Sequence, residues 1–253
     1  MKTLWNSCKA AFAMFSRVPV PPVDWTPENQ RYMFCFFPWV GVVIGGLEIL
    51  MSLAGQHFLG EAFLTGVLMT LIPVLITGGI HLDGLMDTSD AISSYGDREK
   101  RLKILKDPHA GSFAVIACCC WFAVMAASCT RFCMRQKEMM IFALVFAESR
   151  CLSGTGVMTL PRANPEGTVA AFASSAEKKR VLPVLGVYMV LILAGMFLLG
   201  GIRGAIVFAV PCLVFLVCRG SFIRTFGGIS GDLSGFYVCA AEAASALILA
   251  FLY

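Results

Sequence analysis

The sequence predicts an all-α, polytopic integral membrane protein, with about six to eight transmembrane helices and an N-terminal amphipathic helix that lies in the membrane interface. Of its 253 residues, 58% are hydrophobic and 14% are charged, and the mean hydropathy is +0.77. One soluble core cannot bury so much apolar surface. The apolar runs are also far longer than barrel strands, and helices satisfy their own backbone hydrogen bonds in lipid. We expect one transmembrane domain over residues 1–253.

The charged and sulfur-containing residues do not indicate another class of protein. The net charge of +4 is small and lies in the loops, so it gives no sign that the chain binds nucleic acid. Most of the eleven cysteines lie within apolar runs, and the sequence has no Cys-x-x-Cys pair. We therefore expect buried, reduced thiols and not a thiolate metal site.

The first third of the chain predicts the interfacial helix and two spans. Residues 2–17 carry apolar side chains at helical spacing, and the proline-rich segment 18–22 ends that helix. After a polar connector, spans are expected at about 34–54 and 60–80. The second span closes on Gly78-Gly79, where a kink or hinge would aim the following residues back over the bundle.

The rest of the chain alternates apolar runs with polar connections. A short amphipathic helix is expected within 97–106, and Asp107-Pro108 ends it. The run at 204–218 is short for a complete crossing. The other spans are expected at about 111–130, 139–158, 181–201 and 236–253.

The basic residues indicate the orientation of these spans. With a cytoplasmic N-terminus, the polar segments 1–33, 81–110, 159–180 and 219–235 share one face, and they hold 15 of the 20 Lys and Arg residues. The positive-inside rule favours this arrangement. All the polar motifs then gather at the cytoplasmic face of the membrane.

The segment 81–90 places three carboxylates beside very apolar sequence. On a helix, Asp83, Asp87 and Asp90 fall within an arc of about 60°. Three anions on one face repel one another, so a cation would stabilise them, and oxygen ligands favour Mg²⁺, with Mn²⁺ as a substitute. The spacing alone is equally compatible with a solvated loop in which these residues cap or turn the chain.

Two further segments offer groups that suit phosphate. Lys106-Asp107-Pro108-His109 stands before Gly111 and Ser112, whose N–H groups at a helix start could bind an anion. His109 is a candidate general base or phosphate donor, and the alternative is an interfacial histidine that solvates the helix end.

Ionisable residues also occur within the apolar run 139–158. Charges at membrane depth are costly and indicate function by default. Because its forked donors match phosphate, Arg150 is predicted to contact substrate, with Glu148 in support. The alternative is an ion pair that only joins helices. For Glu48, Glu61 and Glu242, structural pairing or interfacial exposure is the favoured interpretation.

The segment 227–235 is a glycine-rich turn with one carboxylate. Gly227 and Gly228 would allow the backbone to approach an anion closely, and Asp232 could add a fourth metal ligand. Clustered Asp residues for a divalent metal, with basic and glycine-rich segments for phosphates, together predict chemistry on a diphosphate at the membrane surface.

These motifs resemble those of the bacterial cobalamin synthase family, the adenosylcobinamide-GDP ribazoletransferases. The turn departs from the pattern, because Ser230 and Phe236 stand where the family leads us to expect Thr and Ala. The resemblance extends over the whole chain, at residues 15–21, 37–41 with Gly45, 81–91, 106–113, 149–150, Arg162 with 166–167, and 227–235.

The resemblance implies a multi-pass enzyme of the bacterial inner membrane with a cytoplasmic active site. It would join adenosylcobinamide-GDP to α-ribazole or its 5′-phosphate, release GMP and form adenosylcobalamin or its 5′-phosphate, with Mg²⁺. Other cobalamin-assembly enzymes are candidate partners. The implied roles are metal binding by Asp83, Asp87, Asp90 and Asp232, phosphate binding by Lys106 and Arg150 with Arg17 or Arg162, and proton acceptance by His109 or one of the aspartates.

Other functions remain open at this stage. A membrane alcohol phosphotransferase or a prenyltransferase would also place Asp-rich helices, metal and diphosphate together, although the segment 81–87 fits the alcohol phosphotransferase signature poorly. A transporter is the alternative from another class. It would favour ionisable residues at mid-membrane in discontinuous helices, whereas most charges here lie at one face.

Overall fold

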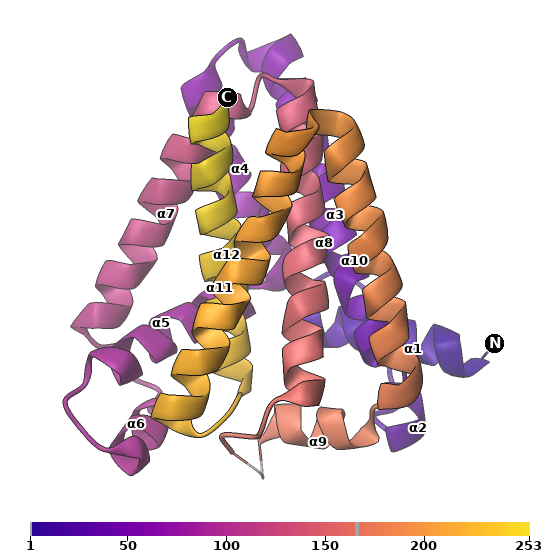
Figure 1. The fold of residues 1–253 in the computed structure, drawn as a ribbon, viewed down its shortest axis with the longest axis vertical. Coiled ribbons are helices and arrows are strands. Elements are labelled where there is room, and N and C mark those ends of the chain that lie inside the picture. Colours follow the sequence, from indigo (N-terminus) through magenta and orange to yellow (C-terminus); the bar gives the residue numbers. More distant parts are fainter. Residues whose placement is uncertain (1, 165–166) are drawn as a thin grey trace.

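The computed structural model describes residues 2–164 and 167–253, and this part of the chain is helical apart from its connections and one isolated β-bridge. The long helices run side by side, with short helices at one end (Figure 1). The elements are α1 (Lys2–Phe15), α2 (Pro27–Gln30), α3 (Met33–Ala54), the π-helical turn η1 (Gly55–Leu59), α4 (Ala62–Thr77), α5 (Ile80–Ser93), α6 (Arg98–Ile104), α7 (Ser112–Phe132), α8 (Gln136–Thr159), α9 (Thr168–Ser175), α10 (Lys178–Gly200), α11 (Ile202–Phe226) and α12 (Gly231–Leu252).

Six helices are long and apolar enough to cross a membrane: α3 with η1, α7, α8, α10, α11 and α12. The pair α4 and α5 adds a seventh crossing if the two helices count as one bent span. This confirms the prediction of an all-α, polytopic membrane protein. The helix expected over residues 2–17 is also present, as α1, and it leaves Leu4 and Trp5 exposed. Its position in the membrane interface stays a prediction.

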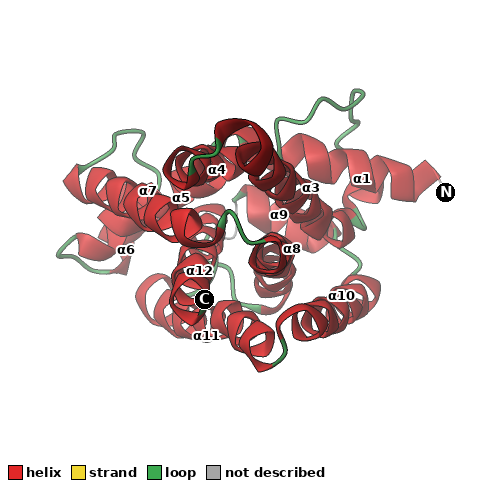
Figure 2. Ribbon diagram, turned by 90° about the horizontal axis from the view of Figure 1, so that it is seen from above, coloured by secondary structure: helices red, strands yellow, loops and turns green. Residues whose placement is uncertain are grey.

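Helix α8 forms the centre of the bundle. Seen from above, α3, α10, α11 and α12 lie around it, while α4 and α7 pack together farther from it (Figure 2). The most apolar stretch of α8 is 78% buried, against 22% for α10 and for α11, so the latter two helices lie at the surface of the bundle. Glycines allow α3 to approach α8 closely, because a Cβ atom at Gly41 or Gly45 would meet the α8 backbone.

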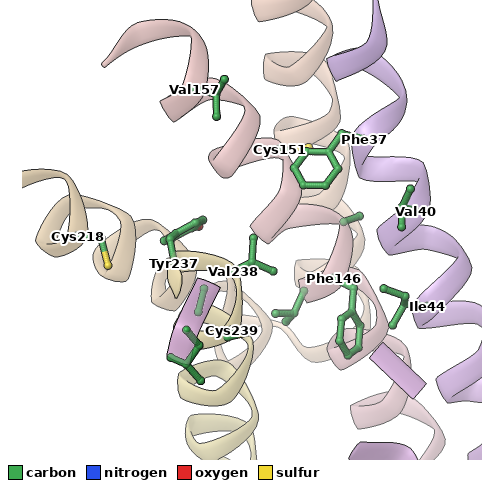
Figure 3. Close-up of a cluster of buried hydrophobic side chains, with 14 of the residues drawn as sticks. Phe37, Val40, Ile44, Phe146, Cys151, Val157, Cys218, Tyr237, Val238 and Cys239 are labelled. Atoms are coloured by element: carbon green, nitrogen blue, oxygen red, sulfur yellow. The ribbon is translucent and has the colours of Figure 1, made fainter. Parts of the chain in front are cut away.

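The buried side chains between the helices are mainly aromatic, aliphatic and cysteine (Figure 3). All eleven cysteines are free, and Cys151, Cys218 and Cys239 lie in the core shown there. They pack as small hydrophobic side chains, as the sequence predicted.

The predicted hinge before the acidic segment is confirmed. Gly78 and Gly79 both adopt positive φ angles, 65° and 83°, and the axes of α4 and α5 differ in direction by 95°. Glycine suits both positions because other residues rarely adopt this conformation. Helix α5 thereby turns away from the span direction, runs across the end of the bundle and packs on α7 and α12.

Several predicted boundaries were wrong. The run expected at 204–218 belongs to α11, whose 25 residues are long enough for a complete crossing, because the helix continues through Arg219 and Arg224. Helix α12 begins at Gly231 and not at 236, so the glycine-rich turn is shorter than predicted. The short helices α2 and α9 were not predicted, because four and eight residues leave little periodicity in the sequence.

Candidate active site

A cavity of about 320 Å³ lies at the end of the bundle where the short helices gather. Its wall is formed by the ends of α1, α3, α5, α8 and α12, by α9 and by the connections beside them. The polar lining residues are His81, Asp83, Ser153, Asn164, Ser230, Asp232 and Ser234. The apolar lining residues are Met14, Phe15, Phe34, Phe37, Ile80, Val157, Val169, Ala170, Phe172 and Ile229.

Close packing of α5 against α12 places Asp83 and Asp232 on this one cavity. A Cβ atom at Gly84 would lie 2.5 Å from the carbonyl oxygen of Asp232, and one at Gly235 would lie 3.0 Å from that of His81. Glycine is therefore required at position 84, and position 235 leaves little room for a larger residue. Each aspartate belongs to the first turn of its helix, where the helix dipole favours a negative charge.

Asp87 adds a third carboxylate, one turn along α5. Helix α5 is not among the six spanning helices. Burial, together with the negative charges of Asp83, Asp232 and Asp90, raises the pKa of Asp87 to about 6. The carboxylates are thus close enough to repel one another, so a bound cation would stabilise them together.

Asp90, the fourth acidic residue predicted to bind metal, caps helix α7. Its two carboxylate oxygens accept hydrogen bonds from the backbone N–H groups of Gly111 (2.6 Å) and Ala114 (2.9 Å). The prediction that Gly111 offers a free N–H group to phosphate is therefore wrong. Ser112, the first residue of α7, is exposed and does not line the cavity.

The donor set fits Mg²⁺ in chemistry but does not enclose it. Across residues 2–164 and 167–253, no three His, Cys, Asp or Glu side chains are arranged to hold a metal ion by themselves. Mg²⁺ in phosphate-handling sites, however, is usually held by one or two carboxylates, with waters and substrate phosphates completing its octahedral shell. Asp83, Asp87 and Asp232 suit that partial role, whereas Asp90 is engaged with α7.

Arg150, predicted to contact substrate, is buried in the bundle instead. It is 0% exposed and donates hydrogen bonds to Glu242 Oε1 (2.7 Å) and to the carbonyl oxygen of Phe146 (2.7 Å). Ser149 Oγ donates to the same carboxylate oxygen at 3.1 Å. The alternative interpretation, an ion pair that joins helices, is the correct one, and it links α8 to α12.

The glutamates at membrane depth, Glu48, Glu148 and Glu242, lie in three different environments. Glu242 is paired, as predicted. Glu148 does not support Arg150, because it accepts a hydrogen bond from the Cys212 thiol, at 3.8 Å. Glu48 is fully buried, and neither of its carboxylate oxygens has a hydrogen-bond partner in the described part of the chain.

His109 and Lys106 do not line the cavity. The His109 ring pairs with Asp107 through Nδ1 and Oδ1 at 2.7 Å, and the His109 side chain is 88% exposed. Hydrogen bonds from the backbone N–H and the side chain of His109 lower the pKa of Asp107. Lys106 is also exposed. This segment therefore forms a solvated turn before α7, matching the alternative that the sequence left open for His109.

The turn before α12 holds a neighbouring segment and not a free anion site. The N–H groups of Gly227 and Gly228 close the end of α11 on the carbonyls of Ile223 and Phe222. Ile229 then pairs with the segment around Arg162, through an N–H donated to Pro161 O at 2.8 Å. The prediction that the two glycine N–H groups bind phosphate is therefore wrong. The turn instead positions Ser230 and Asp232.

Arg17 lies beside the hinge. Its backbone N–H donates to Ile76 O at 2.7 Å, and its side chain occupies the space next to Gly78, where a Cβ atom would meet it. Arg17 is exposed, so its charge is available at the start of α5. Arg162 is half-buried and absent from the cavity lining. Glu166, part of the same resemblance motif, lies outside the described residues.

Comparison with known proteins identifies the family. Residues 7–250 match the family model described as cobalamin-5-phosphate synthase. The adenosylcobinamide-GDP ribazoletransferase of Lachnoclostridium phytofermentans is 38% identical over 247 residues, covering 97% of this chain and 94% of the relative. The protein of the same name from Clostridium botulinum is 30% identical and covers 96% of both chains. The chain belongs to the cobalamin-5-phosphate synthase family. No solved structure matches it.

In this member of the cobalamin-5-phosphate synthase family, the sequence did not predict that His81, Phe15 and Phe37 line the cavity. Phe15 and Phe37 stack with ring centroids 4.1 Å apart, and Phe37 lies 5.9 Å from the His81 ring. His81 is 8% exposed, and its Nε2 has no hydrogen-bond partner among the described residues. These residues belong to segments that carry the family resemblance, but nothing in their spacing predicts that three separate helices bring them together.

Proposed function

We propose that this chain is an adenosylcobinamide-GDP ribazoletransferase. It would transfer the adenosylcobinamide-phosphate group to α-ribazole or α-ribazole 5′-phosphate, releasing GMP and forming adenosylcobalamin or its 5′-phosphate. Relatives that carry this name match nearly the whole chain. The structural observation that supports the proposal is that Asp83 and Asp232, 149 positions apart in the sequence, line one cavity at the end of the bundle.

The transfer needs one nucleophile, one leaving group and one proton acceptor. A ribazole hydroxyl oxygen forms a bond to the phosphorus next to cobinamide, and the bond from that phosphorus to the bridging oxygen breaks. GMP leaves with the electron pair, and the hydroxyl proton passes to a carboxylate. We assign the carboxylate to Asp83 or Asp232, because both line the cavity whereas His109 does not.

The proposed cofactor is Mg²⁺, which Mn²⁺ could replace. Asp83, Asp87 and Asp232 would hold it together with diphosphate oxygens. The ion would neutralise charge on the diphosphate and on the departing GMP. Arg17, exposed beside the hinge, is the proposed basic contact for phosphate. None of Arg17, Lys106 and Arg162 lines the cavity, and Arg17 is preferred because its side chain lies against Gly78, at the hinge where α5 begins.

We place the site at the cytoplasmic face of the bacterial inner membrane. The end of the bundle that carries α6, α9 and the hinge (Figure 1) is the end to which the basic segments of the sequence belong. The positive-inside rule assigns that end to the cytoplasm. A cytoplasmic site would also meet nucleotide substrates on the side where they are made.

The test follows corrinoid product and GMP together, using protein purified in detergent or liposomes. The substrates are adenosylcobinamide-GDP with α-ribazole or its 5′-phosphate, with Mg²⁺ present or chelated. Asp83→Asn is expected to lower the rate roughly 100-fold or more, as loss of a group that stabilises transition-state charge commonly does. Asp24→Asn, the same change at an exposed position outside the cavity, should leave the rate unchanged.

Each outcome separates one part of the proposal from the rest. Product without GMP, or no product from folded wild-type protein with either ribazole, would refute the reaction. A normal rate in Asp83→Asn would retain the reaction but refute the assigned site. Full activity in the presence of a strong chelator would refute the metal.

A further inference from the structure

We infer that the apolar half of the cavity receives the aromatic base of the ribazole, and that the corrinoid stays outside it. This inference rests on the proposed function, since it names the substrate that occupies the proposed site. It assigns specificity for the base to Phe15, Phe34, Phe37 and the α9 helix.

The aromatic side chains form a continuous wall. Phe15 of α1 lies 4.1 Å from Phe37 and 6.3 Å from Phe34, both on α3, measured between ring centroids. Phe172 of α9 adds a further ring to this wall. Trp25, which does not line the cavity, lies next to Phe172, with ring centroids 6.1 Å apart. Flat aromatic bases bind to such surfaces by stacking and by leaving water.

The size of the cavity selects one substrate over the other. About 320 Å³ lies at the low end of the roughly 300–1,000 Å³ typical of small-molecule sites. A benzimidazole nucleoside matches this space, whereas a corrin ring with its side chains and diphosphate far exceeds it. Adenosylcobinamide-GDP can therefore reach the carboxylates only with its GDP end, while its corrinoid remains outside.

The polarity of the lining sets the direction of the nucleoside. Asp83, Asp232 and Ser230 lie on the same cavity as the aromatic wall. A nucleoside with its base against the phenylalanines therefore presents its ribose hydroxyls to the acidic residues. That orientation is the one in which a carboxylate can accept the proton of the attacking hydroxyl.

Helix α9 provides a test with a matched control. Ala170 is 4% exposed and lines the cavity, whereas its neighbour Ala171 is exposed and absent from the lining. Ala170→Phe fills the space assigned to the base, and Ala171→Phe makes the same change on the outer face of the same helix. Both variants are compared with wild type by KM for each substrate and by direct binding of α-ribazole, without adenosylcobinamide-GDP, in detergent.

We expect Ala170→Phe to raise the KM and the dissociation constant for α-ribazole about 10-fold or more, with the KM for adenosylcobinamide-GDP within about twofold of wild type. Ala171→Phe should match wild type for both substrates. If Ala170→Phe does not fold, Phe15→Leu gives the same test, because it keeps an apolar side chain but removes a stacking face. It should weaken α-ribazole binding roughly fivefold to 100-fold.

The binding arm separates failure of this inference from failure of the proposed function. Wild-type protein that binds α-ribazole but makes no product, with binding lost in Ala170→Phe, would support the base site and refute the reaction. Normal turnover with an unchanged α-ribazole KM in Ala170→Phe and Phe15→Leu would refute the base site and leave the reaction intact. Wild-type protein that does not bind α-ribazole at all would overturn the inference.

Discussion

The buried ion pair between Arg150 and Glu242 predicts an unequal response to removing either partner. Glu242→Leu leaves a guanidinium inside the bundle that cannot lose its proton. Arg150→Met leaves a carboxyl group that can take up a proton and become neutral. We therefore expect Glu242→Leu to destabilise the protein more than Arg150→Met, and the double variant to be more stable than Glu242→Leu.

The structure sets the scale of this effect. The two charged atoms are 2.7 Å apart, and at an effective dielectric constant near 20 their gross attraction is about 6 kcal/mol. Desolvation offsets much of it, because the side chains are 0% and 2% exposed. Breaking a buried pair typically costs ~3–5 kcal/mol, which is the range expected for Glu242→Leu. For Arg150→Met we expect about half that cost.

Reversible unfolding in mixed detergent micelles measures these differences, with a double-mutant cycle giving the coupling between the two side chains. A wild-type midpoint for Glu242→Leu would refute the argument. If Arg150→Met left the stability unchanged but raised the KM for adenosylcobinamide-GDP, that result would also refute it. Arg150 would then contact substrate, as its sequence context suggested. A rate loss that accompanies lost stability would support the structural role.

Three further predictions concern the end of the bundle. Asp90→Ala should lower the free energy of unfolding by ~0.5–2 kcal/mol, because it removes the cap of α7, and Asp90→Asn should lower it less. If Asp90→Asn weakens Mg²⁺ binding without loss of stability, this residue binds metal after all. Gly84→Ala should lower the free energy of unfolding by ~1–3 kcal/mol and reduce activity, because it separates α5 from α12. As a control, Gly46→Ala should leave stability unchanged or raise it, because Gly46 has open space around it. Equal effects of the two substitutions would contradict the packing argument. His109→Ala should raise the pKa of Asp107 only part of the way toward the ordinary aspartate value, because the backbone N–H of residue 109, the larger cause of the lowered pKa, still donates to this carboxylate. Carbon-detected NMR of labelled aspartate, assigned with Asp107→Asn, would contradict us if the pKa did not change.

The spans and the hinge could be predicted because their signals are local. Long apolar runs gave the spanning helices, and Gly78-Gly79 marked the bend before the acidic segment. The error at α11 arose from Arg219 and Arg224, which read as a loop but continue the helix at its polar end. Long basic side chains can extend toward the interface while their backbone remains helical, so charge alone does not end a span.

The site residues could be predicted only in part, because their partners are distant in sequence. Spacing placed Asp83, Asp87 and Asp90 on one helix face, but it could not show that Asp90 faces the start of α7. Membrane depth marked Arg150 as costly to bury, yet a substrate phosphate and a partner carboxylate both satisfy that requirement. The choice depended on Glu242, 92 positions away, which no local pattern connects to it.

The 95° bend explains why the candidate active site can exist at this position. A continuous helix over residues 62–93 would extend about 48 Å, beyond a hydrocarbon core of about 30 Å. Its carboxylates would then project past the bundle, away from α12. With the bend, α5 lies across the end of the bundle, and Gly84 and Gly235 permit the approach that brings Asp83 beside Asp232. The same crossing leaves the ends of α1, α3 and α8 as an apolar wall of that cavity. One change of direction therefore produces a cavity that is acidic on one side and aromatic on the other, which suits the proposed transfer of a phosphate-linked group from a diphosphate to an aromatic nucleoside.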